Sequence, residues 1–185
     1  TGRDKIAICG YHGWHDWYII TTERNKGVPK VMKQLSFVFQ YNNIESLKEL
    51  FDAYADEFAA VIMEPVGVTP PQNGFLKDVK KVTHQNGAVL IFDEIITGFR
   101  FALGGAQEYF RVTPDLATFG KAMANGMPIS ALVGKKEIMN VFNETFFSFT
   151  FGGECLSLAA ALATINELKT KKVLDFIWTQ GKKLQ

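Results

Sequence analysis

Short apolar runs that stop abruptly at polar residues constrain the fold of this chain more than any other feature. Residues 59–63 are five apolar residues followed by Glu64, and residues 88–92 are five more followed by Asp93. Runs of this kind are typical of strands buried on both faces of a parallel sheet. Further strands are predicted at residues 5–9, 35–39, 115–119 and 129–133, and helices at 44–58, 76–85 and 156–168.

The alternation of these strands with helices predicts an α/β protein with a mostly parallel sheet flanked by helices. Asn86-Gly87 is expected to end the second helix with a left-handed residue. The third helix, rich in Ala and Leu, is apolar all round and is therefore expected to be buried. No internal domain boundary is predicted, so residues 1–185 are expected to form one domain, cut from a longer chain at both ends.

Charge and composition exclude several classes of partner. The net charge is +1 and no charge block occurs, so nothing favours nucleic acid or an acidic membrane surface. No apolar run approaches the roughly 20 residues of a membrane span. The two cysteines, Cys9 and Cys155, are expected to be reduced core residues of a cytoplasmic protein.

Asp93 and Lys121 are the first candidates for chemistry, because each follows a predicted strand. Ligands bind at the carboxyl edge of open α/β sheets. No other charged residue lies between Asp115 and Lys135, and a lysine in apolar surroundings can become a nucleophile toward a carbonyl. An acid and an amine at this edge suit a cofactor that needs a Schiff base and a carboxylate. Taken alone, Asp93 and the adjacent Glu94 also fit a helix cap or structural ion pair, and Lys121 a solvated surface group.

Two aromatic segments carry weaker signals. In residues 10–15, His12 and His15 have the spacing of a metal pair, but no third ligand cluster supports a metal site, and none is predicted. The aromatic beside the glycines there suits a platform under a planar ring, or simple packing of the loop. Residues 147–154 offer hydroxyl and backbone donors to an anion at a helix start, without the lysine and spacing of a P-loop.

Together these segments resemble the class III aminotransferases that use pyridoxal 5'-phosphate (PLP), within the branch that contains glutamate-1-semialdehyde 2,1-aminomutase. The likeness covers nearly the whole chain. It is carried by YHG at 11–13, EPV at 64–66, LIFDEIITGFR at 90–100, GGAQEYF at 104–110, TPDL at 113–116, FGK at 119–121 and TFGGE at 150–154. It implies the large PLP-binding domain of the fold type I, aspartate aminotransferase-like enzymes, without the N-terminal segment and C-terminal small domain.

The resemblance also implies roles for individual residues. Catalysis would rest on Lys121, which forms the Schiff base, and on Asp93, which pairs with the pyridine nitrogen. The other residues expected to bind the cofactor are Tyr11 over one ring face, His12 beside it, Ile95 on the other face, Thr150 at the phosphate across a dimer interface, and Glu64 nearby.

The implied reaction moves an amino group from an amino donor to an oxo acceptor, in a homodimer with shared active sites. The alternative within the family is the aminomutase. The aminomutase usually carries an insertion between its Glu-Pro-Val motif and a later Pro-Pro, and a mobile lid after the Tyr-His region. Here only three residues separate Val66 from Pro70, and the segment at residues 19–30, where the lid would lie, is short. An alternative of another class is a non-catalytic PLP-domain or dimerisation fragment, since the family's phosphate loop would precede Thr1.

Overall fold

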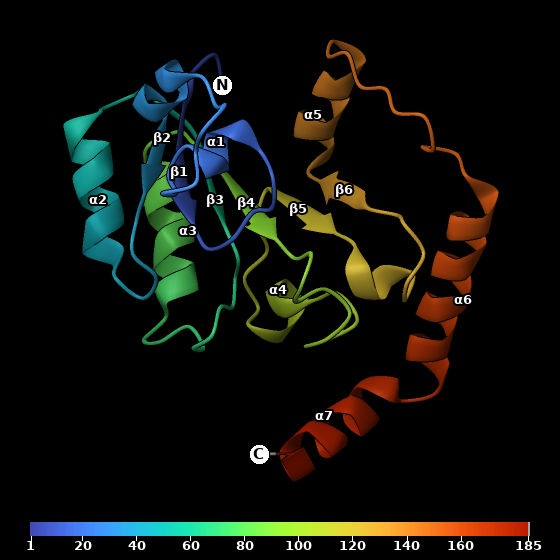
Figure 1. Ribbon diagram of the computed structural model, residues 1–185. Helices are drawn as coiled ribbons and strands as arrows, with labels where there is room; N and C mark the ends of the chain where they lie inside the picture. The colour runs from blue at the N-terminus through green and yellow to red at the C-terminus, as the bar shows by residue number, and fades with distance from the viewer. Residues whose placement is uncertain (185) are drawn as a thin grey trace. The chain divides into compact units, whose positions relative to one another are not determined.

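The computed structural model describes residues 1–184 (Figure 1), and the chain divides into two compact units. The first unit contains residues 1–93 and 114–116, and the second contains residues 94–113 and those from 117 onward. Each unit has its own buried residues and is described separately.

The first unit is built on parallel strands, as predicted. The strands lie in the order β2 (Ser36–Val38), β1 (Lys5–Cys9), β3 (Phe58–Met63) and β4 (Val89–Asp93), and every neighbouring pair is parallel. In the register, Cys9 is opposite Met63, and Met63 is opposite Phe92. The carboxyl ends of β1, β3 and β4 are therefore level, so the residues that follow them are neighbours.

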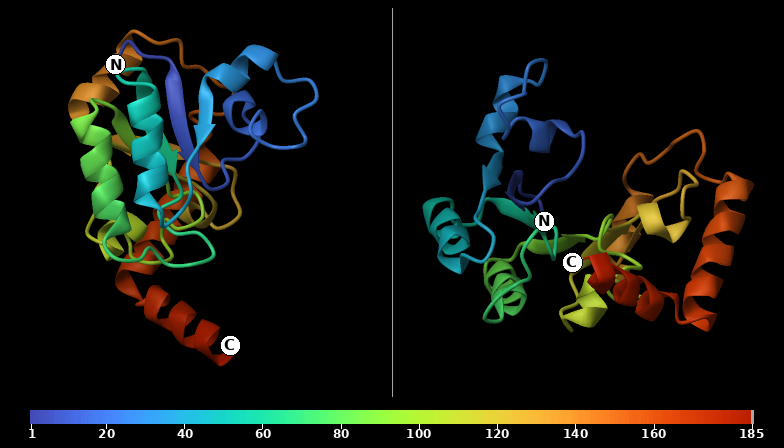
Figure 2. Two further views of the ribbon diagram at one scale, coloured as in Figure 1. Left: turned by 90° about the vertical axis from the view of Figure 1, so that its left-hand side faces the viewer. Right: turned by 60° about the horizontal axis from the view of Figure 1, so that its bottom comes forward.

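Two helices cover this sheet and supply most of the first unit's core. Helix α2 (Ile44–Ala53) and helix α3 (Phe75–Gln85) run side by side against one face of the sheet (Figure 2). Leu47 and Phe51 are buried from α2, and α3 buries a stripe that includes Val79. Full burial of such a side chain is worth about 1.5–3 kcal/mol, so these stripes hold the helices in place.

The ends of both helices follow from local backbone geometry. Helix α2 was predicted to run to Phe58 but ends at Ala53, because Asp56 adopts a left-handed φ of 61° and turns the chain into β3. Gly87 has a φ of +67° after α3, which confirms the predicted left-handed ending. The short α1 (Asp16–Ile19) and the 3-10 helix η1 (Lys30–Gln34) lie between β1 and β2.

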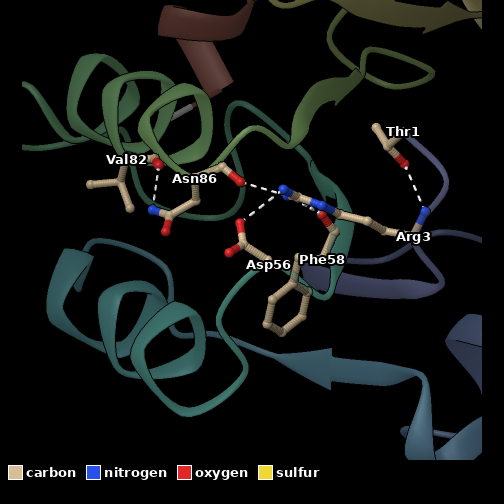
Figure 3. A network of polar contacts seen from close by, with 6 residues as sticks. All are labelled: Thr1, Arg3, Asp56, Phe58, Val82 and Asn86. Carbon is tan, nitrogen blue, oxygen red and sulfur yellow. Dashed lines mark hydrogen bonds and ion pairs between the residues drawn. The ribbon is translucent and has the colours of Figure 1, made fainter.

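Arg3 ties the chain before β1 to two later segments (Figure 3). Its guanidinium donates to the carbonyl oxygens of Asn86 at 2.6 Å and Phe58 at 3.3 Å, and it pairs with Asp56 at 3.0 Å. The planar fork of arginine suits several acceptors at once. The start of β3 and the end of α3 are thereby fixed to the same side chain.

The second unit has a smaller core. Its strands are β5 (Leu116–Phe119) and β6 (Ala131–Gly134), and its helices are α4 (Ala106–Tyr109), η2 (Lys121–Met123), α5 (Lys136–Met139), η3 (Asn140–Asn143), α6 (Cys155–Thr170) and α7 (Val173–Leu184). Ala117, Phe119, Met123, Ala124 and Ala161 form the buried cluster.

Helix α6 was predicted correctly, but its burial was not. Leu156, Leu158 and Leu162 are 64%, 43% and 73% exposed, whereas Ala161 is buried. An all-round apolar helix needs neighbours on several sides, and the described residues cover only the side that carries Ala161. Cys155, on the first turn of α6, is likewise exposed rather than in the core, while Cys9 is buried, and both thiols are free. No helix within residues 1–184 is long and apolar enough to cross a membrane.

Candidate functional site

The level ends of β1 and β3 bring Gly10, Tyr11 and Glu64 together in the first unit. The Glu64 backbone N–H donates to the Cys9 carbonyl at 3.2 Å, and the Glu64 side chain accepts from the Tyr11 N–H at 2.7 Å. Gly10 has a φ of +101°, and a Cβ there would lie 2.7 Å from Glu64 Oε2. The turn after β1 therefore requires glycine, and Glu64 fixes the backbone of Tyr11.

His12 connects this turn to the end of β4. Its Nδ1 lies 2.8 Å from Asp93 Oδ2, and its Nε2 lies 3.1 Å from the Cys9 carbonyl oxygen. The His12 side chain is 1% exposed and the Asp93 side chain 14%. Asp93 is thus a mostly buried carboxylate at a strand end, and it is oriented by a buried histidine that lies 81 residues earlier in the sequence.

The aromatic residues that follow β1 fall into two groups. Trp17 and Tyr18 pack around the His12 ring, with centroid distances of 5.5 and 5.7 Å, and Trp17 also stacks on His15. Tyr11 is 59% exposed and touches Tyr18 only edge to face. Trp17 and Tyr18 therefore pack the loop, whereas Tyr11 keeps surface that a planar ring can cover. No group of three or more His, Cys, Asp or Glu side chains suited to a metal occurs in residues 1–184.

Burial and negative charge dominate the electrostatics at this edge. Burial, and secondly the charge of Glu64, raises the pKa of the Cys9 thiol to about 12. Burial also raises the pKa of Tyr41 to about 12. It raises the pKa of Tyr18 as well, and Tyr11 and Glu64 add to that shift. These groups stay neutral near pH 7, so Cys9 is a packing residue and not a nucleophile.

Lys121 and Ile95 belong to the second unit. Lys121 begins η2 with a left-handed φ of 40°, an uncommon conformation for a residue with a side chain, and it is exposed. A Cβ on Gly120 would lie 3.1 Å from Ile95 Cδ1, so the Ile95 side chain lies against the backbone just before Lys121. Apolar surroundings were expected for Lys121, but its neighbours among the described residues leave it accessible.

Glu94 is a buried carboxylate whose role the sequence did not reveal. It is 0% exposed and accepts from the backbone N–H groups of Ala106 at 2.7 Å and Gln107 at 2.8 Å, and from the Thr97 hydroxyl at 2.5 Å. It therefore holds the first turn of α4, where a negative charge is favourable. The structural role considered for the acidic pair thus falls to Glu94, and the only sequence signal for it is Thr97 three residues later.

Thr150 lies in an exposed segment before α6. The start of α6 was expected to offer donors to an anion, but Glu154 takes two of them, since its side chain accepts from the Leu156 N–H at 2.6 Å and the Ser157 N–H at 2.8 Å. These bonds lower the pKa of Glu154. The chain's own carboxylate therefore occupies this helix end.

The structure thus groups the predicted residues by unit. Tyr11, His12, Glu64 and Asp93 meet at one edge of the first unit's sheet. Ile95 and Lys121 belong to the second unit, as does Thr150, which is remote in sequence from both.

Comparison with known proteins gives one consistent family. The family model described as Aminotransferase class-III matches residues 10–185. The 3-aminobutyryl-CoA aminotransferase of Cloacimonas acidaminovorans (strain Evry) is 45% identical over 99% of this chain and 45% of its own length. A glutamate-1-semialdehyde 2,1-aminomutase of Methanococcoides burtonii is 40% identical over 95% of this chain and 46% of its own length.

Solved structures show the same fold. An omega-transaminase from Sphaerobacter thermophilus matches with a TM-score of 0.84 and 30% identity, over 91% of this chain and 44% of that one. A transaminase with PLP bound matches with a TM-score of 0.89 and 26% identity, over 98% and 47%. The fold prediction is confirmed, and the chain spans about half the length of the relatives it matches.

Proposed function

Because this chain belongs to the class-III aminotransferase family, we propose that it is the PLP-binding part of a cytoplasmic aminotransferase that moves an amino group from an amino donor to an oxo acceptor. The observation that carries the proposal is Asp93, a mostly buried carboxylate at a strand end, held by His12 at 2.8 Å. A carboxylate placed in this way suits a protonated pyridine nitrogen, as the cofactor requires.

The remaining residues fit the same cofactor. The exposed Lys121 amine would bind its aldehyde carbon, and the exposed ring of Tyr11 and the side chain of Ile95 would exclude water from its two faces. Bound PLP would supply the electron sink for the carbon that carries the amino group. The hydroxyl of Thr150 is a donor for the phosphate, whereas the α6 N-terminus is less suitable because Glu154 caps it.

Lys121 and Asp93 would divide the proton chemistry. The Lys121 amine would be the general base that takes a proton from the amino-bearing carbon of the substrate and returns a proton to a neighbouring carbon. The Asp93 carboxylate holds the proton on the ring nitrogen and stabilises it electrostatically. Neither role requires a metal ion.

The cofactor proposal is tested by adding PLP to the 185-residue chain. We expect a visible absorption band that is lost in Lys121→Ala and kept in the matched surface variant Lys136→Ala. A wild-type chain that stays colourless would refute cofactor binding. It would favour the alternative of another class, a non-catalytic fragment that serves folding or dimerisation.

The aminomutase is the second candidate, supported by relatives such as the 40%-identical enzyme of Methanococcoides burtonii. We favour intermolecular transfer because the 45%-identical relative is an aminotransferase. In addition, only three residues separate Val66 from Pro70, where the aminomutase usually carries an insertion. An assay with and without an oxo acceptor separates the two reactions. Strict dependence on the acceptor supports transfer, whereas turnover of one substrate alone supports the mutase. β-Amino acyl-CoA compounds are the first donors to try, given the name of that relative.

We propose that the active protein is a homodimer, on the grounds of an uncovered apolar surface in the second unit. Leu156 and Leu162 of α6 are 64% and 73% exposed, and the preceding segment exposes Phe146, Phe147, Phe149 and Phe151. Sedimentation should give a dimer that Leu162→Lys converts to monomer. Val68→Lys, at a fully exposed site of the first unit, is the control that should remain dimeric.

A further inference from the structure

Tyr11 is fixed at its backbone, but that contact does not hold its ring. Its N–H donates to the Glu64 carboxylate at 2.7 Å, whereas its side chain is 59% exposed. An exposed tyrosine can rotate about two side-chain torsions, and restricting them costs conformational entropy. A ring that is to cover a planar ligand therefore needs a neighbour that selects one orientation.

Tyr18 is the neighbour that meets this ring. The two ring centroids lie 5.6 Å apart, and the ring planes are inclined by 82°. Aromatic pairs favour this edge-to-face arrangement, which shifts an equilibrium by about 2- to 10-fold beyond the effect of burial alone. Because the planes are nearly perpendicular, Tyr18 covers at most one face of the Tyr11 ring, and the other face stays open.

Tyr18 is itself held on several sides. It belongs to α1, and its carbonyl oxygen accepts from the Thr21 hydroxyl at 2.6 Å and from the Thr21 N–H at 3.0 Å. Its ring lies 5.7 Å from the buried ring of His12, at 88°, and 6.4 Å from the ring of Trp17. Tyr18 thus connects a buried ring to the exposed ring of Tyr11, and all of these residues belong to the first unit.

The hydroxyl end of Tyr18 is directed toward Tyr11 and Glu64. Burial raises the pKa of Tyr18, and the Tyr11 phenol and the Glu64 carboxylate raise it further. The hydroxyl makes no hydrogen bond to another group within residues 1–184, so the ring makes the contact with Tyr11.

We propose that Tyr18 is a positioning residue, whose ring holds the Tyr11 ring in the orientation that leaves one face free for a planar ligand. The contact between the two rings stands on the geometry of the first unit. Its consequence for cofactor binding rests on the proposed function, in which Tyr11 covers one face of the cofactor ring.

The alternative is that Tyr18 only fills space beside His12 and Trp17. In that case its loss would loosen α1 but leave the orientation of the Tyr11 ring unchanged. Two substitutions separate these roles, because Tyr18→Phe keeps the ring and removes the hydroxyl, whereas Tyr18→Leu keeps an apolar side chain without a ring. Trp14→Leu is the matched control, since Trp14 is 87% exposed and contacts no other ring within residues 1–184.

The first test is NMR of the cofactor-free chain with carbon-13 in its tyrosine rings. The chain has five tyrosines, so Tyr11→Phe and Tyr18→Phe assign the two sets of signals by elimination. We expect nuclear Overhauser contacts between the two rings, and Tyr11 ring signals displaced from those of free tyrosine by the Tyr18 ring current. The displacement should persist in Tyr18→Phe and Trp14→Leu and disappear in Tyr18→Leu.

Tyr11 signals that are the same in Tyr18→Leu as in the wild-type chain would overturn the proposal. Absence of an Overhauser contact between the two rings in the wild-type chain would also overturn it, and this result does not depend on whether Tyr18→Leu folds.

The second test measures the affinity for PLP by its visible absorption band. We expect the Kd of Tyr18→Leu to rise about 2- to 10-fold, as the energy of one aromatic pair implies, and the Kd values of Tyr18→Phe and Trp14→Leu to stay within about 2-fold of wild type. Equal Kd values for Tyr18→Leu and the wild-type chain would overturn the consequence for the cofactor. A wild-type chain that binds no PLP would refute the proposed function, whereas the NMR of the cofactor-free chain would still decide whether Tyr18 orients Tyr11.

Discussion

Replacing Glu94 by Gln tests whether this buried carboxylate organises the loop between β4 and α4. In the native chain one oxygen, Oε2, accepts from the Thr97 hydroxyl and the Ala106 N–H, and the other accepts from the Gln107 N–H. Glutamine has nearly the same shape but offers only one acceptor oxygen. Whichever way its amide turns, its NH2 group faces a backbone N–H.

The cost follows from these three bonds. One backbone hydrogen bond to a charged acceptor is lost, worth about 1.5–3 kcal/mol, and the others lose their charge assistance. We therefore expect Glu94→Gln to lower the free energy of unfolding by about 2–4 kcal/mol. With a urea m-value of about 2 kcal/mol/M, the midpoint should fall by about 1–2 M.

Glu108→Gln is the matched control. Glu108 also accepts from a backbone N–H of this loop, that of Gly104 at 2.6 Å, but its side chain is exposed. Water can replace this bond, so we expect a change within about 0.5 kcal/mol. Urea unfolding followed by far-UV circular dichroism at 25 °C compares the three proteins. Equal midpoints for Glu94→Gln and Glu108→Gln would refute the argument that burial makes the Glu94 carboxylate essential.

Four further outcomes are expected, concerning the two cysteines, Gly10 and Arg3. Cys155 should react with a thiol reagent at pH 8 in the folded chain, whereas Cys9, with its pKa raised from 9.0 to about 12, should react only on unfolding. Because the unfolded thiol ionises first, the stability that Cys9 contributes is present below about pH 9 and is lost as the pH rises toward 12, and Cys9→Ala should flatten this part of the pH profile. Gly10→Ala should destabilise the chain more than Gly13→Ala in urea, since both have a positive φ but only Gly10 lacks room for a Cβ. Arg3→Lys should lose nearly as much stability in the same assay as Arg3→Ala, about 1–2 kcal/mol, because one ammonium group cannot serve three acceptors.

The sheet was predictable because its signals are local. The runs at 59–63 and 88–92 are apolar enough to identify buried strands, and they became β3 and β4 with boundaries one residue away. The end of α2 was missed because periodicity continued through Tyr54 and Phe58, both apolar. The left-handed conformation of Asp56 sets the end of the helix. Aspartate can adopt this conformation, but its presence in a sequence does not predict it.

The burial of α6 was not predictable from its own residues. The sequence of an apolar helix indicates how much apolar surface needs to be buried, but not which segment or molecule covers that surface. Ala161 is covered by Phe119 and its neighbours, while Leu162, the next residue, is 73% exposed. The apolar composition of α6 therefore indicated correctly that the helix needs apolar neighbours. The expectation of burial failed because the described residues cover only one side of the helix.

Asp93 and Glu94 show why the site itself could be predicted only in part. Successive side chains at the end of a strand point in opposite directions, so adjacent acids must enter different surroundings. Asp93 meets His12, which comes from 81 residues earlier, and keeps some exposure, whereas Glu94 meets N–H donors 12 and 13 residues later and is wholly buried. Sequence order indicates that an acid stands at the strand end, but the partners that make one carboxylate available to a ligand and the other structural are remote in the chain. The assignment of chemistry to Asp93 therefore depends on its contact with His12, which the order of residues around the strand end does not indicate.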